Sequence, residues 1–448
     1  MWIIVVAVLL RLGFLALSVH NNGSDALVSG DAIGYLELAR NLASGNGFVS
    51  PVDGVLAPEV FRAPGLPLLI APFAILPFGI IIYGALLSLL AGVLLPFLTY
   101  HIGTRITTDK AALIAAGLVS IEPHLVIHSF LPLSEMPFTL FALGGFLAAL
   151  VAHEKSSYRF SLLAGALLGC AVLIRPGFLH IFLVLAIGAW LVLFLSKDTR
   201  QRYVIAMLAM AVVILAPWYA RNYEVTGALS LSGQGWRNVY TDYLASVRAL
   251  KKGTSFGDEK NKLKDEALPR FGLSRAEVGN PANSKILRDA ALEELWRSKT
   301  TVVKLETALL ASFFLQDGYY YAFRKYGFLT DTPEPHASPT YEFLTKGIGG
   351  GISATTQELA RQKFIPLFGR LFTIAVFAGA ILGFFLARGR LRYIIAGTII
   401  LTALISTVIG LGIEARLRVP VEPFLFILAS AAVMWIVRRY QIKFKYGN

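Results

Sequence analysis

The sequence has few charged residues for its length. Only 15% of its 448 residues are Asp, Glu, Lys or Arg, while 56% are hydrophobic and the mean hydropathy is +0.63. Soluble globular chains carry roughly 25% charged residues. A chain this apolar could not cover itself with a polar surface in water. We therefore expect a membrane protein, and not a soluble enzyme or a disordered tail.

Other absences narrow the function. The single cysteine, Cys170, excludes an internal disulfide and so a secreted disulfide scaffold. The sequence contains no Walker loop, no Rossmann glycine pattern, no HExxH motif and no GxSxG elbow. Nucleotide-driven chemistry and serine hydrolysis therefore have no support. Residues 1–19 lack a basic start and a small-residue cleavage site, and Arg11 lies mid-segment, so we do not expect a signal peptide.

The sequence does contain a series of apolar stretches. Each is close to the length of about 20 residues that a helix needs to cross a bilayer. They predict an all-α polytopic membrane protein with about ten transmembrane helices, at 2–19, 79–100, 111–128, 136–152, 160–174, 178–196, 203–219, 366–387, 391–411 and 419–437.

Four further segments do not fit a simple span. The run 65–78 is interrupted by three prolines, which indicates a re-entrant or interfacial piece. Residues 283–298 carry apolar side chains on one helical face, with Asn283 or Ser284 as the cap. The run 307–315 is too short to span and is expected at the interface. The glycines of 347–351 predict a flexible loop.

Basic residues predict the orientation of the helices. Fourteen lysines and arginines, but only three acidic residues, occur in five alternate segments: 101–110, 153–159, 197–202, 388–392 and 438–448. By the positive-inside rule these segments and both termini are cytoplasmic. They account for most of the net charge of +13. The charge is therefore an orientation signal, and we expect no nucleic-acid partner.

The same topology divides the chain into three parts. Residues 1–219 form a transmembrane catalytic module whose large first outside loop is 20–64. Residues 220–365 form a mixed extracytoplasmic or interfacial region. Residues 366–448 supply the last transmembrane helices and a basic cytoplasmic tail.

Several carboxylates fall at the predicted outside edge of the membrane. Asp31 precedes a helical pattern, where it could be an N-cap, a catalytic carboxylate or both. Glu59 lies three residues before Arg62, where a surface ion pair is the simple alternative. Glu122 and Glu135 flank the next outside link, and Ser134 is a candidate cap beside Glu135. Acidic residues at a membrane edge are costly unless they are paired or solvated in a cavity.

Two histidines lie between those glutamates. His124 and His128 have i, i+4 spacing, which could bind a metal, although two histidines alone are weak evidence.

Arginines cluster on the same predicted side. Guanidinium groups suit phosphate because they donate two parallel hydrogen bonds. Snorkelling to lipid headgroups is the alternative for any one of them. Taken with the carboxylates, the set favours a membrane substrate that carries phosphate: Arg175, Arg221, Arg416 and Arg418. For Arg11 the sequence leaves open whether it lines the bundle interior or snorkels.

These motifs, in this order, resemble the GT-C superfamily of polytopic membrane glycosyltransferases, in particular protein O-mannosyltransferases and lipid A aminoarabinose transferases. The matching pieces are GDAIGYLELARNL with the following GNGF, FRAPGLPLLIAPF, PLSE, LIRPG, PWYARNY and ARLRVPVEP. Residues 228–365 have no such match.

The resemblance implies a catalytic Asp in the first outside loop, and Asp31 matches that position. It implies a second acid in the second outside loop, where Glu135 matches best and Glu122 competes. Glu59 matches more weakly. Tyr35 and Arg62 fall within the matching motifs and are grouped with the substrate-binding arginines. A divalent metal, Mg or Mn, is used by some members, with Asp31 and Glu135 as the ligands here.

The resemblance also implies the chemistry. The donor is a polyprenyl-phosphate-linked sugar, the acceptor a hydroxyl of a glycan, lipid or protein of the cell envelope, and the site extracytoplasmic in a bacterial inner membrane. One base and direct displacement predict an inverting hexosyl or pentosyl transferase. A transporter or flippase of lipid-linked sugars, which often has related halves, is one alternative. A polymerase or ligase of whole glycans is the other.

Overall fold

The computed structural model describes residues 2–28, 30–52, 54–74, 79–329, 339–362, 364–387 and 389–446. These residues are mostly helical, and the only sheet among them is an antiparallel hairpin of β1 (Val49–Val52) and β2 (Val55–Pro58). The fold class is therefore the expected all-α polytopic one.

Seven helices in the described part of the chain are long and apolar enough to cross a membrane. They are α1 (Trp2–Asn22), α4 (Ile80–Gly103), α7 (Glu135–Lys155), α9 (Phe178–Leu195), α10 (Gln201–Thr226), α18 (Ile365–Leu386) and α19 (Leu391–Ser406), the last extended to Gly412 by a 3₁₀ segment. Helix α8 (Tyr158–Ile174) is apolar but shorter, and α20 (Glu422–Tyr446) covers the last predicted span.

The expected span 111–128 is wrong, because two helices occupy it. Helix α5 (Asp109–Ile121) ends before Glu122, and α6 (Pro123–His128) begins after it. A residue that precedes proline is pushed out of the helical region, and Glu122 accordingly has an extended backbone. Its carboxylate accepts a hydrogen bond from the Leu125 amide at 2.6 Å and so caps α6.

Two other expectations are wrong in the second half of the chain. The run 307–315 is no separate interfacial piece, because it completes α15 (Lys299–Leu315), whose Leu305, Leu309 and Phe313 are buried in the largest core. The glycines of 347–351 do not form a loop. They lie inside α17 (Pro339–Arg361), where only Gly347, with φ of 72°, interrupts the helical backbone.

The amphipathic helix expected at 283–298 is confirmed as α14 (Ser284–Arg297). Leu287, Ala290 and Ala291 are its buried face, whereas Ile286 is exposed. Asn283 occupies the cap position but its side chain makes no capping hydrogen bond.

The proline-marked run 65–78 contains no spanning helix among its described residues. It forms α3 (Gly65–Ile70) and a 3₁₀ turn (Ala71–Phe73), while 75–78 lie outside the described residues. Arg388, counted in the basic segment 388–392, also lies outside them.

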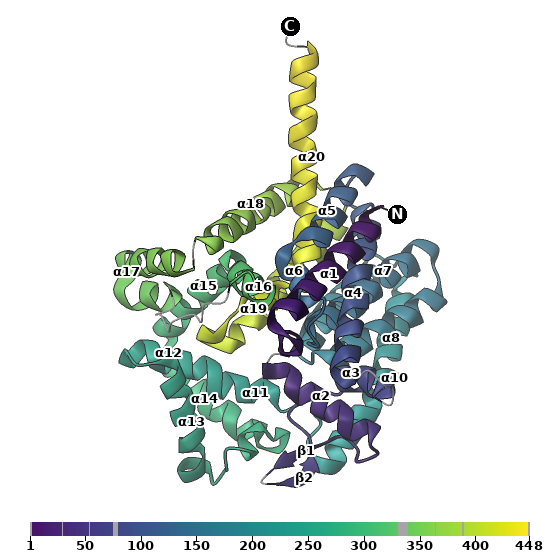
Figure 1. Ribbon diagram of the computed structural model, residues 1–448. Helices are drawn as coiled ribbons and strands as arrows, with labels where there is room; N and C mark the ends of the chain where they lie inside the picture. The colour runs from purple at the N-terminus through teal and green to yellow at the C-terminus, as the bar shows by residue number, and fades with distance from the viewer. Residues whose placement is uncertain are drawn as a thin grey trace.

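The remaining helices lie mostly at one end of the molecule. Both termini lie at the opposite end, with α20 projecting beyond the bundle there (Figure 1). The hairpin and the helices α2, α11, α13 and α14 lie together at the other end (Figure 1). The bounds not yet given are α2 (Gly30–Ala43), α11 (Gln234–Asn238), α12 (Leu244–Lys252), α13 (Phe256–Phe271) and α16 (Tyr319–Lys325).

Arg11 lies in the bundle interior and does not snorkel. It is fully buried and donates hydrogen bonds to Ser129 Oγ and to the carbonyls of Val119 and Ser120, all within 3.0 Å. It therefore fastens α1 to the α5–α6 region.

Candidate active site

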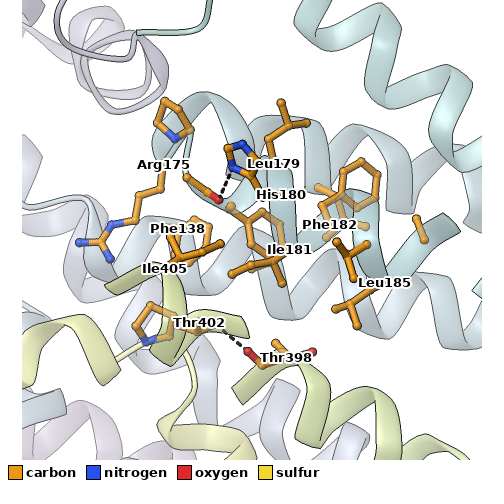
Figure 2. Close-up of a pocket in the computed structure, with 18 of the residues that line it drawn as sticks. Phe138, Arg175, Leu179, His180, Ile181, Phe182, Leu185, Thr398, Thr402 and Ile405 are labelled. Carbon is orange, nitrogen blue, oxygen red and sulfur yellow. Dashed lines mark hydrogen bonds between the residues drawn. The ribbon is translucent and has the colours of Figure 1, made fainter. Parts of the chain in front are cut away.

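A cavity of about 1830 Å³ connects the end of the molecule that holds α2 to the interior of the helix bundle. The polar residues that line it near α2 include Asp31, Tyr35, Arg62, Glu135, Arg175 and Arg416. Its longer part is apolar and runs between α7, α8, α9, α10 and α19. Figure 2 shows this part, where Ile181, Phe182 and Leu185 of α9 lie opposite Ile405 and Thr402, with Arg175 at one end.

Asp31 lies in the first turn of α2, inside the helix, so the N-cap interpretation is wrong. An acidic side chain there is stabilised by the helix dipole. Its Oδ2 atom is 2.8 Å from Arg416 Nη1, and about half of the Asp31 side chain is exposed.

Arg416 connects several carboxylates at the mouth of the cavity. Its Nε atom is 2.8 Å from Glu414 Oε2. Burial by itself would lower the pKa of Arg416, but the carboxylates of Glu135, Glu414 and Asp31 together raise it. Arg416 is therefore charged at every accessible pH.

Glu135 and Arg175 form the second ion pair of the site. Glu135 begins α7 and is buried, and its Oε1 accepts a hydrogen bond from Arg175 Nη2 at 2.6 Å. Arg175 Nε also donates to Ser134 Oγ at 3.0 Å, so Ser134 holds the arginine and does not cap the helix. Pro176 explains the position of Arg175, because it favours the extended backbone that ends α8 there.

Arg62 reaches the cavity beside Tyr35. Its guanidinium lies 4.9 Å from the centroid of the Tyr35 ring, a cation–π distance. Gly34 makes room for it, because a Cβ there would lie 2.7 Å from the guanidinium carbon. Burial raises the pKa of Tyr35, although Arg62 opposes this, and the phenol stays protonated as a hydrogen-bond donor.

Glu59 and Arg221 lie behind the cavity wall and hold the first outside loop. Glu59 Oε1 accepts hydrogen bonds from the backbone amides of Phe61 and Arg62 at 2.6 and 3.0 Å, so its carboxylate organises the turn before Arg62. Arg221 donates to the carbonyls of Glu59 and Phe48 at 2.6 and 3.1 Å and lies over the Trp218 ring. Neither residue lines the cavity.

Arg418 is also turned away from the cavity. It is buried and donates to the carbonyls of Phe313 and Gln316 at 2.8 and 2.6 Å and to Glu422 at 3.2 Å. It therefore joins the start of α20 to the end of α15. The sequence grouped it with Arg416, but the two side chains lie in different environments.

Comparison with known proteins bears on the fold that carries this cavity. The family model described as dolichyl-phosphate-mannose-protein mannosyltransferase matches residues 62–220. The structure is similar to ArnT from Cupriavidus metallidurans bound to undecaprenyl phosphate, with a TM-score of 0.51 and 15% identity over 95% of this chain and 60% of that chain. The chain has the GT-C fold.

A second solved structure supports the GT-C fold. It is the Archaeoglobus fulgidus oligosaccharyltransferase tethered with an acceptor peptide, with a TM-score of 0.50 and 14% identity over 98% of this chain and 50% of that chain. The chain thus spans half to three-fifths of the length of the two proteins. No curated protein sequence matches it. At these identities the likeness establishes the fold alone.

The two carboxylates expected to hold a metal, Asp31 and Glu135, are each engaged by an arginine. Asp31 is paired with Arg416 and Glu135 with Arg175. Within the described ranges, the one group of three ligating side chains close enough for a metal is Glu122, His124 and Glu422, which excludes both.

Two residues at the site were missed by sequence reasoning. Glu414 pairs with Arg416, and its place two residues before that arginine was the available signal. Arg237, in the region without a family match, lines the cavity and lies 5.1 Å from the Phe61 ring centroid. Nothing in the sequence around Arg237 pointed to the site.

Proposed function

We propose that this chain is an inverting glycosyltransferase that moves a sugar from a polyprenyl-phosphate donor to an acceptor hydroxyl. The observation that carries the proposal is the form of the cavity, which joins a long apolar crevice to a mouth containing Asp31, Arg175 and Arg416. A polyprenyl tail matches the crevice, and a phosphate matches the arginines. The ArnT relative is bound to undecaprenyl phosphate, a ligand of this chemistry.

The reaction needs one base and one stabilised leaving group. The acceptor oxygen attacks the anomeric carbon, the bond from that carbon to the phosphate oxygen breaks, and polyprenyl phosphate leaves. Arg175 and Arg416 stabilise the charge that develops on the phosphate. Asp31 takes the acceptor proton. Direct displacement inverts the anomeric carbon.

The ion pair between Asp31 and Arg416 gives the site an order of events. Before the donor binds, Arg416 neutralises Asp31 at 2.8 Å. A donor phosphate competes for the same guanidinium. Its binding therefore loosens the ion pair and leaves the half-exposed Asp31 free to contact the acceptor.

Glu135 acts through Arg175. Its carboxylate holds the guanidinium from the buried side, so that the arginine points along the cavity and does not collapse onto the bundle. We assign Glu135 as a positioning residue of the phosphate site.

The location follows from the predicted topology. The protein crosses a membrane several times, and we propose the bacterial inner membrane with both termini cytoplasmic and the cavity mouth extracytoplasmic. The placement of both termini at the end opposite α2 supports this arrangement (Figure 1). Fusions of a fluorescent protein, which fluoresces only in the cytoplasm, to either terminus test it.

A flippase is the second candidate, because the cavity also reaches Arg200 and Arg390 in two of the predicted cytoplasmic segments. A path for a hydrated sugar would need polar groups along its length. The middle of the cavity is instead lined by apolar side chains with a few hydroxyls, such as Thr398 and Thr402. That lining suits a hydrocarbon tail better than a sugar.

The deciding experiment is transfer by the purified protein in lipid vesicles. A panel of isotope-labelled polyprenyl-phosphate hexoses and pentoses is supplied with envelope extract, and products are analysed by mass spectrometry. Asp31→Asn should abolish transfer while the protein stays folded and inserted. Asp109→Asn is the matched control, since Asp109 also lies in the first turn of a helix but outside the cavity. Full activity of Asp31→Asn, or lipid movement without a covalent product, would refute the proposal.

A further inference from the structure

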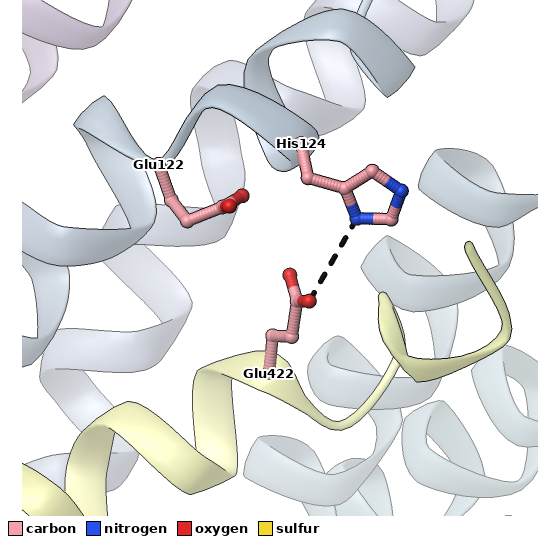
Figure 3. Close-up of side chains that lie close together, drawn as sticks. All are labelled: Glu122, His124 and Glu422. Carbon is pink, nitrogen blue, oxygen red and sulfur yellow. Dashed lines mark ion pairs between the residues drawn. The ribbon is translucent and has the colours of Figure 1, made fainter. Parts of the chain in front are cut away.

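A second cluster of ionisable side chains lies away from the candidate active site. Glu122 and His124 lie at the turn between α5 and α6, and Glu422 begins α20. Each offers one ligand atom, and the three atoms lie within 4.8 Å of one another. Figure 3 shows the carboxylates of Glu122 and Glu422 and the imidazole of His124 turned toward a common space.

The cluster is buried and incompletely hydrogen-bonded. Glu122, His124 and Glu422 are only 5%, 2% and 4% exposed. Among the residues that the structure describes, His124 Nδ1 and Glu422 Oε2 have no hydrogen-bond partner. His124 Nδ1 is 3.8 Å from Glu422 Oε1, beyond hydrogen-bonding distance. Buried polar atoms without partners are costly, so each one requires an explanation, such as an ion.

Only one oxygen of the Glu422 carboxylate is engaged by an arginine. Arg418 donates to Glu422 Oε1 at 3.2 Å and leaves Oε2 free. Burial, together with the nearby Glu422, raises the pKa of Glu122. A bound cation would supply the contacts that His124 Nδ1 and Glu422 Oε2 lack.

The surrounding backbone holds the ligands in place. The glycine at 318 has φ of +72°, and a Cβ on it would lie 2.7 Å from His124 Cδ2, so this backbone packs directly on the imidazole. Glu122 is held by the Leu125 amide at 2.6 Å. His128 does not belong to the group of ligand atoms that lie within 4.8 Å of one another, and its Nδ1 is hydrogen-bonded to the His124 carbonyl at 2.8 Å. The metal pair suggested by the i, i+4 histidines is therefore replaced by a His–Glu–Glu set.

We propose that Glu122, His124 and Glu422 bind a divalent transition-metal cation, for which Zn²⁺ is the best match. One imidazole nitrogen and two carboxylate oxygens are ligands that Zn²⁺ accepts, with a fourth position for water. Zinc–ligand bonds of about 2 Å require the three atoms to approach further. The ion joins the α5–α6 turn to the start of α20, and so links segments about 300 residues apart without entering the active site.

The test measures metal on the purified full-length protein in detergent. Protein stripped with EDTA is given ZnCl₂, unbound metal is removed, and zinc per chain is determined by mass spectrometry. The wild type should retain one zinc, and added zinc should raise its melting temperature. Loss of a residue that only hydrogen-bonds to a metal ligand weakens metal binding about 10–100-fold. Loss of a ligand itself, as in His124→Gln, should therefore weaken zinc binding by at least about 100-fold.

Matched variants separate this site from the active site. His128→Gln, next on the same helix face, and Asp31→Asn should both keep the zinc and the rise in melting temperature. Glu122→Gln gives a second ligand variant if His124→Gln is unstable. If the wild type retains no zinc, the proposal is overturned. A proton shared within the cluster of Glu122, His124 and Glu422 is then the remaining occupant. Equal zinc on the wild type and both ligand variants, or loss of zinc in Asp31→Asn, also overturns it.

Discussion

Arg416 Nη1 lies 2.8 Å from Asp31 Oδ2, although 385 residues separate them in the chain. The contact brings the segment just before α20 against the first turn of α2. The Glu135 carboxylate is also near enough to raise the pKa of Arg416. The candidate site is therefore assembled from both ends of the chain, and Arg416 is the charge that its carboxylates share.

Replacement of Arg416 should reduce the rate of sugar transfer without unfolding the protein. We expect Arg416→Gln to lower kcat by about 10²–10³-fold, because one preorganised electrostatic contact to the leaving group is lost. Arg416→Lys should retain more activity than Arg416→Gln, because it keeps the positive charge. It should be slower than the wild type, because lysine cannot make the bidentate contact of arginine. Initial rates at saturating donor measure the effect.

Arg105→Gln is the control for charge loss. Arg105 also pairs with a carboxylate, Glu154 at 2.8 Å, but in a segment predicted to be cytoplasmic. Its replacement should leave the transfer rate within about twofold. An Arg416→Gln enzyme as fast as Arg105→Gln would show that Arg416 has no role in the transition state.

Glu135 and Arg175 should behave as an energetically coupled pair. Arg175→Ala leaves a buried carboxylate without its partner, which costs about 3 kcal/mol of unfolding free energy. Glu135→Gln should cost less, because Arg175 is partly exposed and retains Ser134. The double variant should lose less than the sum of the single losses. Equilibrium denaturation of the four proteins measures the coupling, and strictly additive losses would contradict it.

The glycine of the FRAPG motif should be required for stability. A Cβ on Gly65 would lie 2.6 Å from the Ile174 backbone nitrogen, so Gly65→Ala forces α3 away from the end of α8, next to Arg175. Overpacking of this kind typically costs about 1–3 kcal/mol. Gly34→Ala meets only the far end of the Arg62 side chain, and should change substrate affinity more than stability. Melting temperatures and KM separate the two effects.

Gly117→Ala is the matched control for both glycines. Gly117 lies in α5, and a Cβ there meets nothing within 4 Å. Alanine in a helix interior is favoured over glycine by up to about 1 kcal/mol. Gly117→Ala should therefore be neutral or stabilising, and an equal loss in Gly117→Ala and Gly65→Ala would refute the packing argument.

The sequence predicted that residues far apart in the chain share one side of the membrane, because helix alternation and basic segments place the motif residues there. Asp31, Glu135, Arg175 and Arg416 were selected that way and Arg62 by the family motifs, and the structure brings all five to one cavity. Helix ends could also be predicted, because they depend on local sequence. Pro176, for example, favours the extended backbone of Arg175 that ends α8.

Side-chain direction was not predictable from the same signals. Arg221 and Arg418 occupy similar positions in their motifs, yet the structure turns both toward backbone carbonyls. That choice depends on which carbonyls of distant segments are left unpaired. The approach of Glu422 to His124 likewise depends on how α20 packs against α5 and α6, which no local pattern encodes.

The apolar crevice should determine the preference for the lipid part of the donor. Gly188 of α9 lines the cavity, and a Cβ there meets nothing within 4 Å. Gly188→Trp therefore places an indole, whose Cβ has room, at the wall of the crevice. We expect a large rise in KM for a long polyprenyl-phosphate sugar and little change for an analogue with a short tail, because each buried CH₂ contributes about 0.8 kcal/mol.

Gly117→Trp, outside the cavity, should change neither KM. If Gly188→Trp weakens both donors equally, the tail does not occupy the crevice. The apolar part of the cavity would then need another occupant.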